Sequence, residues 1–407
     1  MNRLRILITS SYYWPEPAGN APYVTGLAEH LAAQGHDVAV ATGFPHYPAW
    51  ASTPRRLAQH EVRNNVVIRR RWHYVPHAQS AFTRGVYEAT LWAFGATALP
   101  LTRPDVVVGV VPTLAAAALA RLAGVVHRRP YGLIFQDIVG LAATQSGIEG
   151  GHRIAGVVGR GELRLARRAA AIAVIADGFG RYFERHGVDR DRIRRLRNWS
   201  QDVTPVEARA ETRARLGWPA DSFICVHAGN MGHKQGLENV LAAAERLRGG
   251  NTLLVLAGDG NERERLEQIA RSRELENVLF LPPSPPGEYE ALLRAADVLL
   301  VNQRASVGEM SLASKLTSYF AAGRPVLAAV APESETAREV VAAGAGMLAP
   351  PDDPQALADA LTALATNDTR ASEYRQNALR YTSERLTQTA VLREYEAFVR
   401  DLAGSRR

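Results

Sequence analysis

A glycine-rich loop follows an apolar run in the second half of the sequence. The run Phe223–Ala228 is followed by three glycines and one lysine: Gly229, Gly232, Lys234 and Gly236. Glycine lets the backbone approach a ligand closely, and the unpaired N–H groups at the start of a following helix attract phosphate oxygens. The loop therefore suits a diphosphate, although its spacing matches neither a Walker loop nor the G-x-G-x-x-G pattern.

A second group of polar residues lies in the stretch 306–318. Glu309 precedes Ser314 and Lys315 there, so a carboxylate and an ammonium share one junction between a loop and a predicted helix. Only two of the 48 basic residues are lysine, Lys234 and Lys315, and each falls in one of these two loops. A compact ammonium is a different ligand from a planar guanidinium. We interpret both lysines as binding residues, with coincidence in a long chain as the alternative.

An aromatic loop follows the first apolar run, residues 4–9. It contains Tyr13 and Trp14 and leads through Gly19 and Asn20 into a predicted helix. The start of that helix offers N–H groups to phosphate or sugar oxygens. We interpret these four residues as acceptor or sugar ligands, because aromatic side chains in an exposed loop need a function. A plain turn between a strand and a helix is the alternative.

Three more candidates follow predicted strands. His46 lies between two prolines and is a candidate acid, base or hydroxyl ligand, or else an ordinary loop residue. Asp137, a candidate catalytic residue, follows the run Tyr131–Phe135, where a sheet would present a carboxylate; the alternative is an aspartate that is solvated or caps a helix. Gly258 opens a Gly-Asp-Gly segment that we interpret as part of the donor site, with a simple turn as the alternative.

Short apolar runs alternate with longer amphipathic ones along the whole chain. Strands that are regularly followed by helices predict a parallel sheet covered on both faces. The arginine-rich stretch 187–222 interrupts this rhythm, which then restarts. We therefore predict an α/β fold of two doubly wound parallel-sheet domains, residues 1–198 and 199–384. The last helix, about residues 385–407, has no strand left to cover and is expected to fold back on the first domain.

Two kinds of protein have this plan. Ligands bind at the carboxyl ends of parallel strands, and two sheets that face each other form a cleft there. Transferases with twin nucleotide-binding domains and binding proteins that close around a hinge are both built this way. The first ten residues lack a signal-peptide pattern, which disfavours a secreted binding protein.

The composition is that of an ordinary globular chain. Its 407 residues are 46% hydrophobic, and the uncharged stretches fall short of the ~20 residues that a membrane-spanning helix needs. A single cysteine, Cys225, excludes a disulfide framework and fits a reducing, cytoplasmic setting. The net charge of +7 allows nucleic acid, an anionic membrane or a phosphorylated substrate as partner. The arginine clusters lack interleaved aromatic residues, so we expect no nucleic acid.

Taken together, these motifs resemble the retaining GT-B glycosyltransferases, especially the branch that builds bacterial exopolysaccharides and O-antigens. The similarity covers nearly the whole chain and is strongest in residues 13–16, 43–48, 197–199, 227–236, 257–260 and 314–325. The resemblance implies two Rossmann-like domains, of which the second holds a UDP- or GDP-linked sugar and the first holds the acceptor. It also implies retention of the anomeric configuration, with no metal ion and no cofactor.

The carboxylates of the family pattern are only partly present. Glu309 matches the first carboxylate of the paired-glutamate motif, which the resemblance places on the transferred sugar. Ser318 stands where the second carboxylate, the usual ribose ligand, is expected. Gln136 precedes Asp137 at a point where many relatives have a histidine, so a catalytic histidine does not carry over.

The family's pair of cations at the diphosphate is also altered. Asn230 stands at the arginine position and Gln235 lies close to the lysine position. Lys234 or Lys315 is therefore expected to supply the positive charge. Our hypothesis is that these lysines and nearby helix N-termini stabilise the departing diphosphate, so that the reaction needs little acid-base work from side chains.

We therefore expect a peripheral cytoplasmic enzyme that moves a sugar from a nucleotide-diphosphate sugar to a saccharide or lipid-linked acceptor. The stretch 82–102 is aromatic and flanked by basic residues, so an anionic inner membrane face would attract it. A core helix is the alternative for this stretch. Two other functions stay open: a sugar-nucleotide 2-epimerase, which needs no acceptor, and a non-catalytic partner subunit, which has no turnover.

Overall fold

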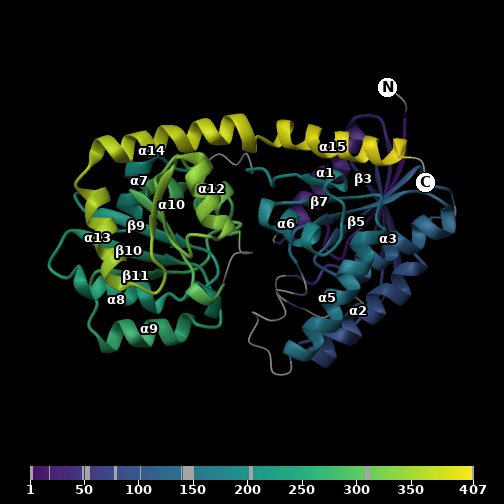
Figure 1. The fold of residues 1–407 in the computed structure, drawn as a ribbon. Coiled ribbons are helices and arrows are strands. Elements are labelled where there is room, and N and C mark those ends of the chain that lie inside the picture. The colour runs from purple at the N-terminus through teal and green to yellow at the C-terminus, as the bar shows by residue number, and fades with distance from the viewer. Residues whose placement is uncertain are drawn as a thin grey trace. The chain divides into compact units, whose positions relative to one another are not determined.

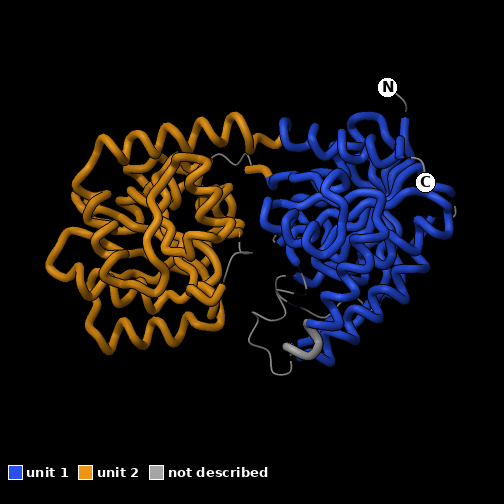
Figure 2. The backbone as a smooth tube through the Cα atoms, in the orientation of Figure 1, with its two compact units in different colours: residues 1–198, 389–407 blue, residues 199–388 orange. Residues whose placement is uncertain are grey.

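The chain folds into two compact units, which Figure 2 shows in different colours. Unit 1 comprises residues 1–198 and 389–407, and unit 2 comprises residues 199–388. The computed structural model describes residues 3–17, 19–47, 50, 56–77, 80–100, 102–138, 140, 151–200, 205–307 and 312–405, with the backbone alone for 151–155. The expected sugar ligand Glu309 lies outside the described residues.

Unit 1 is built on an eight-stranded sheet in the order β3-β4-β2-β1-β5-β6-β7-β8. Its strands are β1 (Arg5–Thr9), β2 (Asp37–Gly43), β3 (Ala58–Arg63), β4 (Val66–Arg71), β5 (Val106–Val111), β6 (Tyr131–Phe135), β7 (Ala171–Val174) and β8 (Ile193–Arg195). The central strand β5 is buried along its whole length, as expected of a parallel strand covered on both faces.

Strand β3 corrects the expectation of a wholly parallel first sheet. It pairs antiparallel with β4 at the edge of the sheet. The two strands are joined by Asn64 and Asn65, whose φ angles of 47° and 63° suit a two-residue hairpin turn. The sequence pattern did not reveal β3 because its side chains are mostly polar and half-exposed.

Helices cover both faces of this sheet (Figure 1). They are α1 (Ala21–Ala33), α2 (Ala81–Ala96), α3 (Leu114–His127), α5 (Gly151–Arg168), α6 (Asp177–Arg185) and α15 (Gln388–Gly404). Helix α3 packs between α2 and α5. The C-terminal helix α15 lies beside α1, where Glu396 accepts a hydrogen bond from His30 at 3.0 Å.

Unit 2 is built on a six-stranded sheet, parallel throughout, in the order β11-β10-β9-β12-β13-β14. The strands are β9 (Phe223–Ala228), β10 (Thr252–Ala257), β11 (Val278–Leu281), β12 (Val298–Asn302), β13 (Val326–Ala329) and β14 (Gly346–Ala349). The helices are α7 (Arg209–Arg215), α8 (Glu238–Arg246), α9 (Arg263–Ser272), α10 (Glu288–Ala295), α11 (Leu316–Ala321), α12 (Glu335–Ala343), α13 (Pro354–Ala365) and α14 (Asp368–Tyr381).

The two sheets confirm the predicted class, two doubly wound α/β folds. Each unit has its own core of buried valine, leucine, isoleucine and alanine side chains from the central strands and the inner faces of the helices. In the part of the chain that the structure describes, every helix is too short or too polar to cross a bilayer.

Candidate functional site

The loop after β9 in unit 2 rests directly on the loop after β10. The N–H of Gly229 donates to the carbonyl of Ala257 at 2.8 Å, and the N–H of Met231 donates to that of Asp259 at 2.8 Å. A Cβ on Gly258, whose φ is +138°, would lie 1.9 Å from the carbonyl oxygen of Gly229. Glycine at position 258 is therefore required by the packing of the two loops.

The side chains of the β9 loop bond to one another. Gln235 ends the 3₁₀ turn η2 (His233–Gln235), and its Oε1 accepts from the N–H of Gly232 at 3.1 Å. The same oxygen accepts from Nδ2 of Asn230 at 3.4 Å. Asn230 and Gln235, which the resemblance places at or near the family's cation positions, thus organise the loop and bring no charge to it.

Lys234 and Arg304 are cations of the same region. Lys234 is half-buried in η2, and its carbonyl accepts from the N–H of Arg304 at 3.0 Å. The guanidinium of Arg304, just after β12, pairs with Glu238 and donates to the carbonyl of His233 at 2.8 Å. The sequence analysis did not predict Arg304 as a site residue. Its position as the first charged residue after a strand could have indicated it.

Lys315 carries its ammonium to the carboxyl end of β9. Its Nζ lies 3.2 Å from Nε2 of His227, and a Cβ on Gly229 would be 3.4 Å from it. Burial lowers the pKa of Lys315 to about 7. Burial and, as a smaller cause, the charge of Lys315 hold the pKa of His227 well below its usual range. This neighbour of the ammonium is therefore neutral. Among the described residues, which leave out 308–311, Lys315 forms no ion pair.

Tyr319 fixes the helix that carries Lys315. Its hydroxyl is fully buried and accepts from the N–H of Ala228 at 2.9 Å, which ties α11 to the end of β9. Lys315 is the N-cap residue of α11, Ser314 beside it is exposed, and Ser318 is half-buried one turn further on. The structure therefore brings Lys315 to the glycine loop, and Tyr319 is a positioning residue that the sequence did not reveal. Ser314 and Ser318 stay predicted donor ligands.

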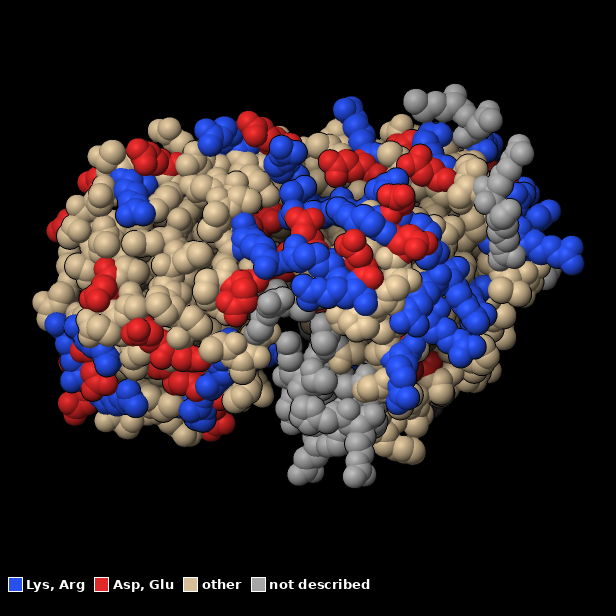
Figure 3. Space-filling view, in the orientation of Figure 1, with Lys and Arg blue, Asp and Glu red and all other residues tan. Residues whose placement is uncertain are grey.

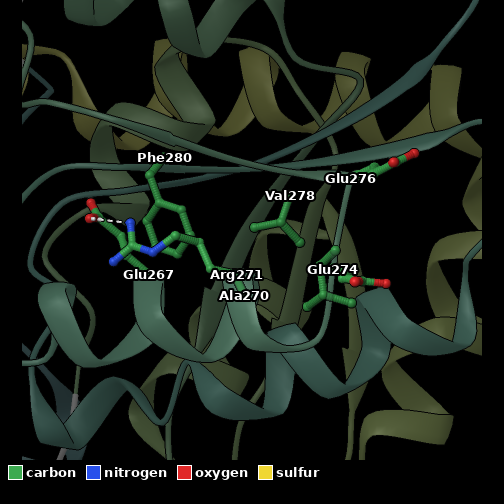
Figure 4. Close-up of a pocket in the computed structure, with 8 residues that line it drawn as sticks. Glu267, Ala270, Arg271, Glu274, Glu276, Val278 and Phe280 are labelled. Atoms are coloured by element: carbon green, nitrogen blue, oxygen red, sulfur yellow. Dashed lines mark ion pairs between the residues drawn. The ribbon is translucent and has the colours of Figure 1, made fainter.

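Two hollows of unit 2 have different linings. One of about 440 Å³ opens beside the loop after β10 and is lined by Asp259, Gly260, Asn261, Arg263, Glu264 and Glu267. Another of about 340 Å³ lies between the end of α9 and β11 (Figure 4). The second includes Glu267, Glu274 and Glu276 and none of the predicted donor ligands, so its acidic rim does not suit a diphosphate.

In unit 1, the buried carboxylate of Glu16 anchors the aromatic loop. It accepts three backbone hydrogen bonds, from the N–H groups of Tyr13 at 3.0 Å and of His46 and Tyr47 at 2.9 Å each. These contacts join the loop after β1 to the loop after β2. Burial raises the pKa of Glu16 from its usual value. The sequence singled out this glutamate only as part of the family resemblance.

Replacing Glu16 by alanine should lower the free energy of unfolding by about 2 to 4 kcal/mol, because three buried N–H groups lose their acceptor. Urea unfolding followed by tryptophan fluorescence measures the change. Glu373→Ala, at an exposed position of α14, is the matched control and should shift the curve by less than about 0.5 kcal/mol. Equal effects in the two variants would contradict the anchoring role.

The expectation that the aromatic side chains of this loop are exposed was wrong for its tyrosines. Tyr12 and Tyr13 are 7% and 1% exposed, so their rings belong to the core of unit 1. Trp14 is 37% exposed, and the guanidinium of Arg63 lies 4.5 Å from the centre of its ring. Trp14 alone offers a surface to a ligand, and its role there stays a prediction.

His46 is buried and uses both ring nitrogens within the protein. Nδ1 lies 2.9 Å from the carbonyl of Phe44, and Nε2 lies 3.2 Å from the hydroxyl of Tyr87. Burial lowers the pKa of His46 to about 4, so the imidazole is neutral at physiological pH. This geometry argues against the expected role of His46 as an acid or hydroxyl ligand and assigns it to the packing of the loop.

Gly19 and Asn20 lie at the start of α1. Gly19 has a φ of +66°, and a Cβ there would lie 3.2 Å from the ring of Tyr47. Asn20 is 6% exposed, and neither atom of its amide has a hydrogen-bond partner among the described residues. A buried amide left unpaired costs stability unless a ligand or water completes its bonds. Both residues remain predicted ligands.

Asp137 is exposed just after β6, and its Oδ1 accepts from the N–H of Ile138 at 2.8 Å. Its catalytic role stays a prediction. The neighbouring Gln136 has a structural partner, because its Oε1 accepts from Nδ2 of Asn198 at 2.8 Å. Within the described residues, no three side chains of histidine, cysteine, aspartate or glutamate gather as metal ligands would.

Both halves of the chain match known protein families. Residues 18–199 match the family described as "Glycosyl transferase 4-like domain", and residues 208–381 match "Glycosyl transferases group 1". WcaI of Escherichia coli (strain K12), described as a colanic acid biosynthesis glycosyl transferase, is 32% identical over 340 residues. These residues make up 79% of the present chain and 82% of WcaI.

Solved structures share the fold at lower identity. HepE of Anabaena in complex with UDP and glucose aligns with a TM-score of 0.70 and 16% identity, over 97% of this chain and 99% of that one. WaaG, described as a glycosyltransferase involved in lipopolysaccharide biosynthesis, gives 0.68 and 19% over the same shares. The family matches and the relationship to WcaI show that the chain belongs to the group 1 glycosyl transferases and is a GT-B glycosyltransferase.

Proposed function

We propose that the chain transfers a sugar from a nucleotide-diphosphate sugar, held by unit 2, to a saccharide or lipid-linked acceptor of cell-surface polysaccharide biosynthesis. The observation that carries this proposal is the ammonium of Lys315 beside Gly229, where no carboxylate of the described residues neutralises it. A diphosphate leaving group suits a compact ammonium that lies beside a glycine, where the backbone leaves room for the ligand.

Lys315 supplies the charge that stabilises the leaving diphosphate. As the bond between the anomeric carbon and the phosphate oxygen breaks, negative charge grows on the diphosphate, and a positioned cation lowers the barrier most at that moment. The acceptor hydroxyl oxygen forms the new bond to the anomeric carbon, and its proton passes to the diphosphate oxygen that leaves. We propose that the transfer proceeds with retention of configuration. We also propose that it needs no metal ion, because Lys315 and the loop neutralise the charge of the diphosphate.

Relatives support a nucleotide-sugar donor and a glycan acceptor. HepE was solved with UDP and glucose, and the names of WcaI and WaaG place them in colanic acid and lipopolysaccharide biosynthesis. A uridine diphosphate sugar is therefore the donor that we propose to try first, with a GDP-linked sugar second. We further propose that the enzyme works at the cytoplasmic face of the membrane that holds its acceptor.

A thermal-shift screen of the purified protein against UDP, GDP, dTDP, CDP and the matching sugar nucleotides tests the donor. A ligand that binds only the folded state at 100 times its Kd stabilises it by about 2.7 kcal/mol and raises Tm accordingly. We expect a selective shift for one base. The absence of any shift would favour a non-catalytic partner subunit, and conversion of the donor without an acceptor would favour an epimerase.

Two further measurements test the proposed retention of configuration and the proposed independence of a metal ion. The anomeric coupling in the proton NMR spectrum of the product reports the configuration, which we expect to equal that of the donor. Turnover measured with and without EDTA reports the need for a metal ion, and we expect equal rates. An inverted product, or a rate lost in EDTA and restored by a divalent cation, would each overturn its part of the proposal.

A further inference from the structure

The positive charge of the chain is concentrated in unit 1. Arginine and lysine outnumber aspartate and glutamate there by 29 to 16, which gives a formal charge of +13, whereas unit 2 has 19 against 25 and a formal charge of −6. On the face drawn in Figure 3, basic side chains gather in a broad group over unit 1. The excess charge therefore points to a partner of unit 1 with extended negative charge.

Helix α2 of unit 1 turns apolar residues to the solvent. Its most exposed residues are Phe82, Gly85, Ala89, Trp92 and Ala93. Phe82 is 79% exposed and Trp92 is 44% exposed. A surface helix normally presents polar residues to water, so the stripe is the reverse of the usual pattern. The alternative that this stretch forms a core helix therefore does not hold for the outer side of α2.

Helix α5 adds a stripe of arginines to the same layer of helices. The exposed residues of its described part, 156–168, are Gly156, Val157, Arg160, Arg164, Arg167 and Arg168. Helix α3, which packs between α2 and α5, exposes Val125 at 54% and Val126 at 62% near its end. Aromatic side chains on α2, valines near the end of α3 and arginines on α5 are thus exposed on one layer of packed helices.

The two carboxylates of these helices point inward. Glu88 of α2 accepts from the N–H of Ala115 at 2.8 Å and caps α3, and Glu162 of α5 is 1% exposed and accepts from the N–H of Gly140 at 3.2 Å. Among the described residues of α2, α3 and α5, no glutamate or aspartate is exposed beside the arginines. The positive charge of this layer is therefore not balanced on its own surface.

We infer that the outer sides of α2 and α5, hereafter the α2/α5 surface, dock on a bilayer that contains anionic phospholipid. Aromatic side chains insert at the boundary of headgroups and acyl chains, while the guanidinium groups contact lipid phosphates. The choice of a membrane as partner rests on the proposed function, because a lipid-linked acceptor would be reached from its surface. The lack of a spanning helix among the described residues agrees with a peripheral mode.

Vesicle sedimentation tests the α2/α5 surface. The full chain should sediment with vesicles of phosphatidylglycerol and phosphatidylcholine, and not with phosphatidylcholine alone. Phe82→Asp/Trp92→Asp should lower the partition coefficient by about ten-fold per aromatic side chain. Arg160→Glu/Arg164→Glu should lower it by about five-fold or more per arginine, and added salt should lower it in the wild type. All four positions are exposed or half-exposed, so the fold should persist, which circular dichroism checks.

Matched controls come from unit 2. Val341→Asp changes a valine that is 65% exposed on α12, and Arg380→Glu changes an exposed arginine of α14. Both should sediment like the wild type. A wild type that stays in the supernatant, or α2/α5 variants that sediment as well as the controls, would overturn the inference. So would light scattering that shows a dimer dissociated by Phe82→Asp/Trp92→Asp, since the surface would then belong to a second copy.

The test also separates this inference from the proposed function. Each variant is measured for its thermal shift with the nucleotide that stabilises the wild type. Loss of sedimentation with an unchanged shift supports the α2/α5 surface. If the protein sediments through this surface but binds no nucleotide, the inference of a membrane surface is supported and the proposed donor is rejected. If the protein transfers sugar without sedimenting, the proposed function is supported and the membrane surface is rejected.

Discussion

Replacing Lys315 by methionine should lower turnover by about two to three orders of magnitude. Removal of one group that stabilises the charge of a transition state costs that much in other enzymes. Methionine keeps the length and apolar stem of lysine and removes only the charge next to Gly229. Initial rates with the donor identified by thermal shift measure the effect, and a rate like that of the wild type would contradict the role of Lys315.

The same substitution should stabilise the folded protein at low pH. The pKa of Lys315 is about 7 in the folded state, against an ordinary value of 10.5. Below pH 7 the folded state bears the whole cost of a buried ammonium. Between pH 7 and about 10.5 the unfolded state binds the proton and the folded state does not, so the free energy of unfolding rises with pH. Lys315→Met should therefore have a higher Tm than the wild type at pH 6, and the difference should shrink toward pH 10.

Donor binding should depend on pH in the opposite direction. The diphosphate binds the protonated lysine, so above pH 7 binding must take up a proton and the Kd for the nucleotide should rise by up to about ten-fold per pH unit. Lys315→Arg keeps its charge over this range and should bind with a flatter profile. Isothermal titration at pH 6, 7, 8 and 9 compares the two. A Kd for the wild type that is constant over this range would contradict the coupling.

The sequence alone was sufficient to predict that Lys315 lies near the glycine loop. Both follow strands of one predicted parallel sheet, and the carboxyl ends of such strands share an edge. The rarity of lysine added a second, independent reason to connect them. The sequence did not show that His227 is the neighbour of the ammonium or that Tyr319 holds its helix, because these contacts depend on how α11 packs on β9.

The loops of unit 1 were harder to predict for a physical reason. Whether Tyr13 and His46 face the ligand or the core is decided by Glu16, which accepts N–H bonds from two loops thirty residues apart. Hydrophobic periodicity gives no information on such contacts, since neither loop has a repeating pattern. For α2 the sequence left two interpretations open, a stretch attracted to a membrane and a core helix, because apolar residues in a helical pattern do not show which side its neighbours cover.

Replacing Gly258 by alanine should cost about 3 to 5 kcal/mol of stability and weaken donor binding. A Cβ would lie 1.9 Å from the carbonyl oxygen of Gly229, so one of the two loops must move, and the φ of +138° adds backbone strain. A shift of the loop after β9 would also move Gly229 away from the ammonium of Lys315, the proposed ligand of the donor diphosphate. Urea unfolding gives the loss of stability, and isothermal titration with the selected nucleotide gives the loss of affinity.

Gly249→Ala separates the close approach from the backbone strain. Gly249 also has a positive φ, +73°, but a Cβ there would meet nothing within 4 Å. Its substitution should cost only about 1 kcal/mol and leave the Kd unchanged. The difference between the two variants therefore measures the contact of the loops after β9 and β10. If both variants lose the same stability and keep the same Kd, the two loops are able to separate freely, and the donor site does not depend on the contact at Gly258.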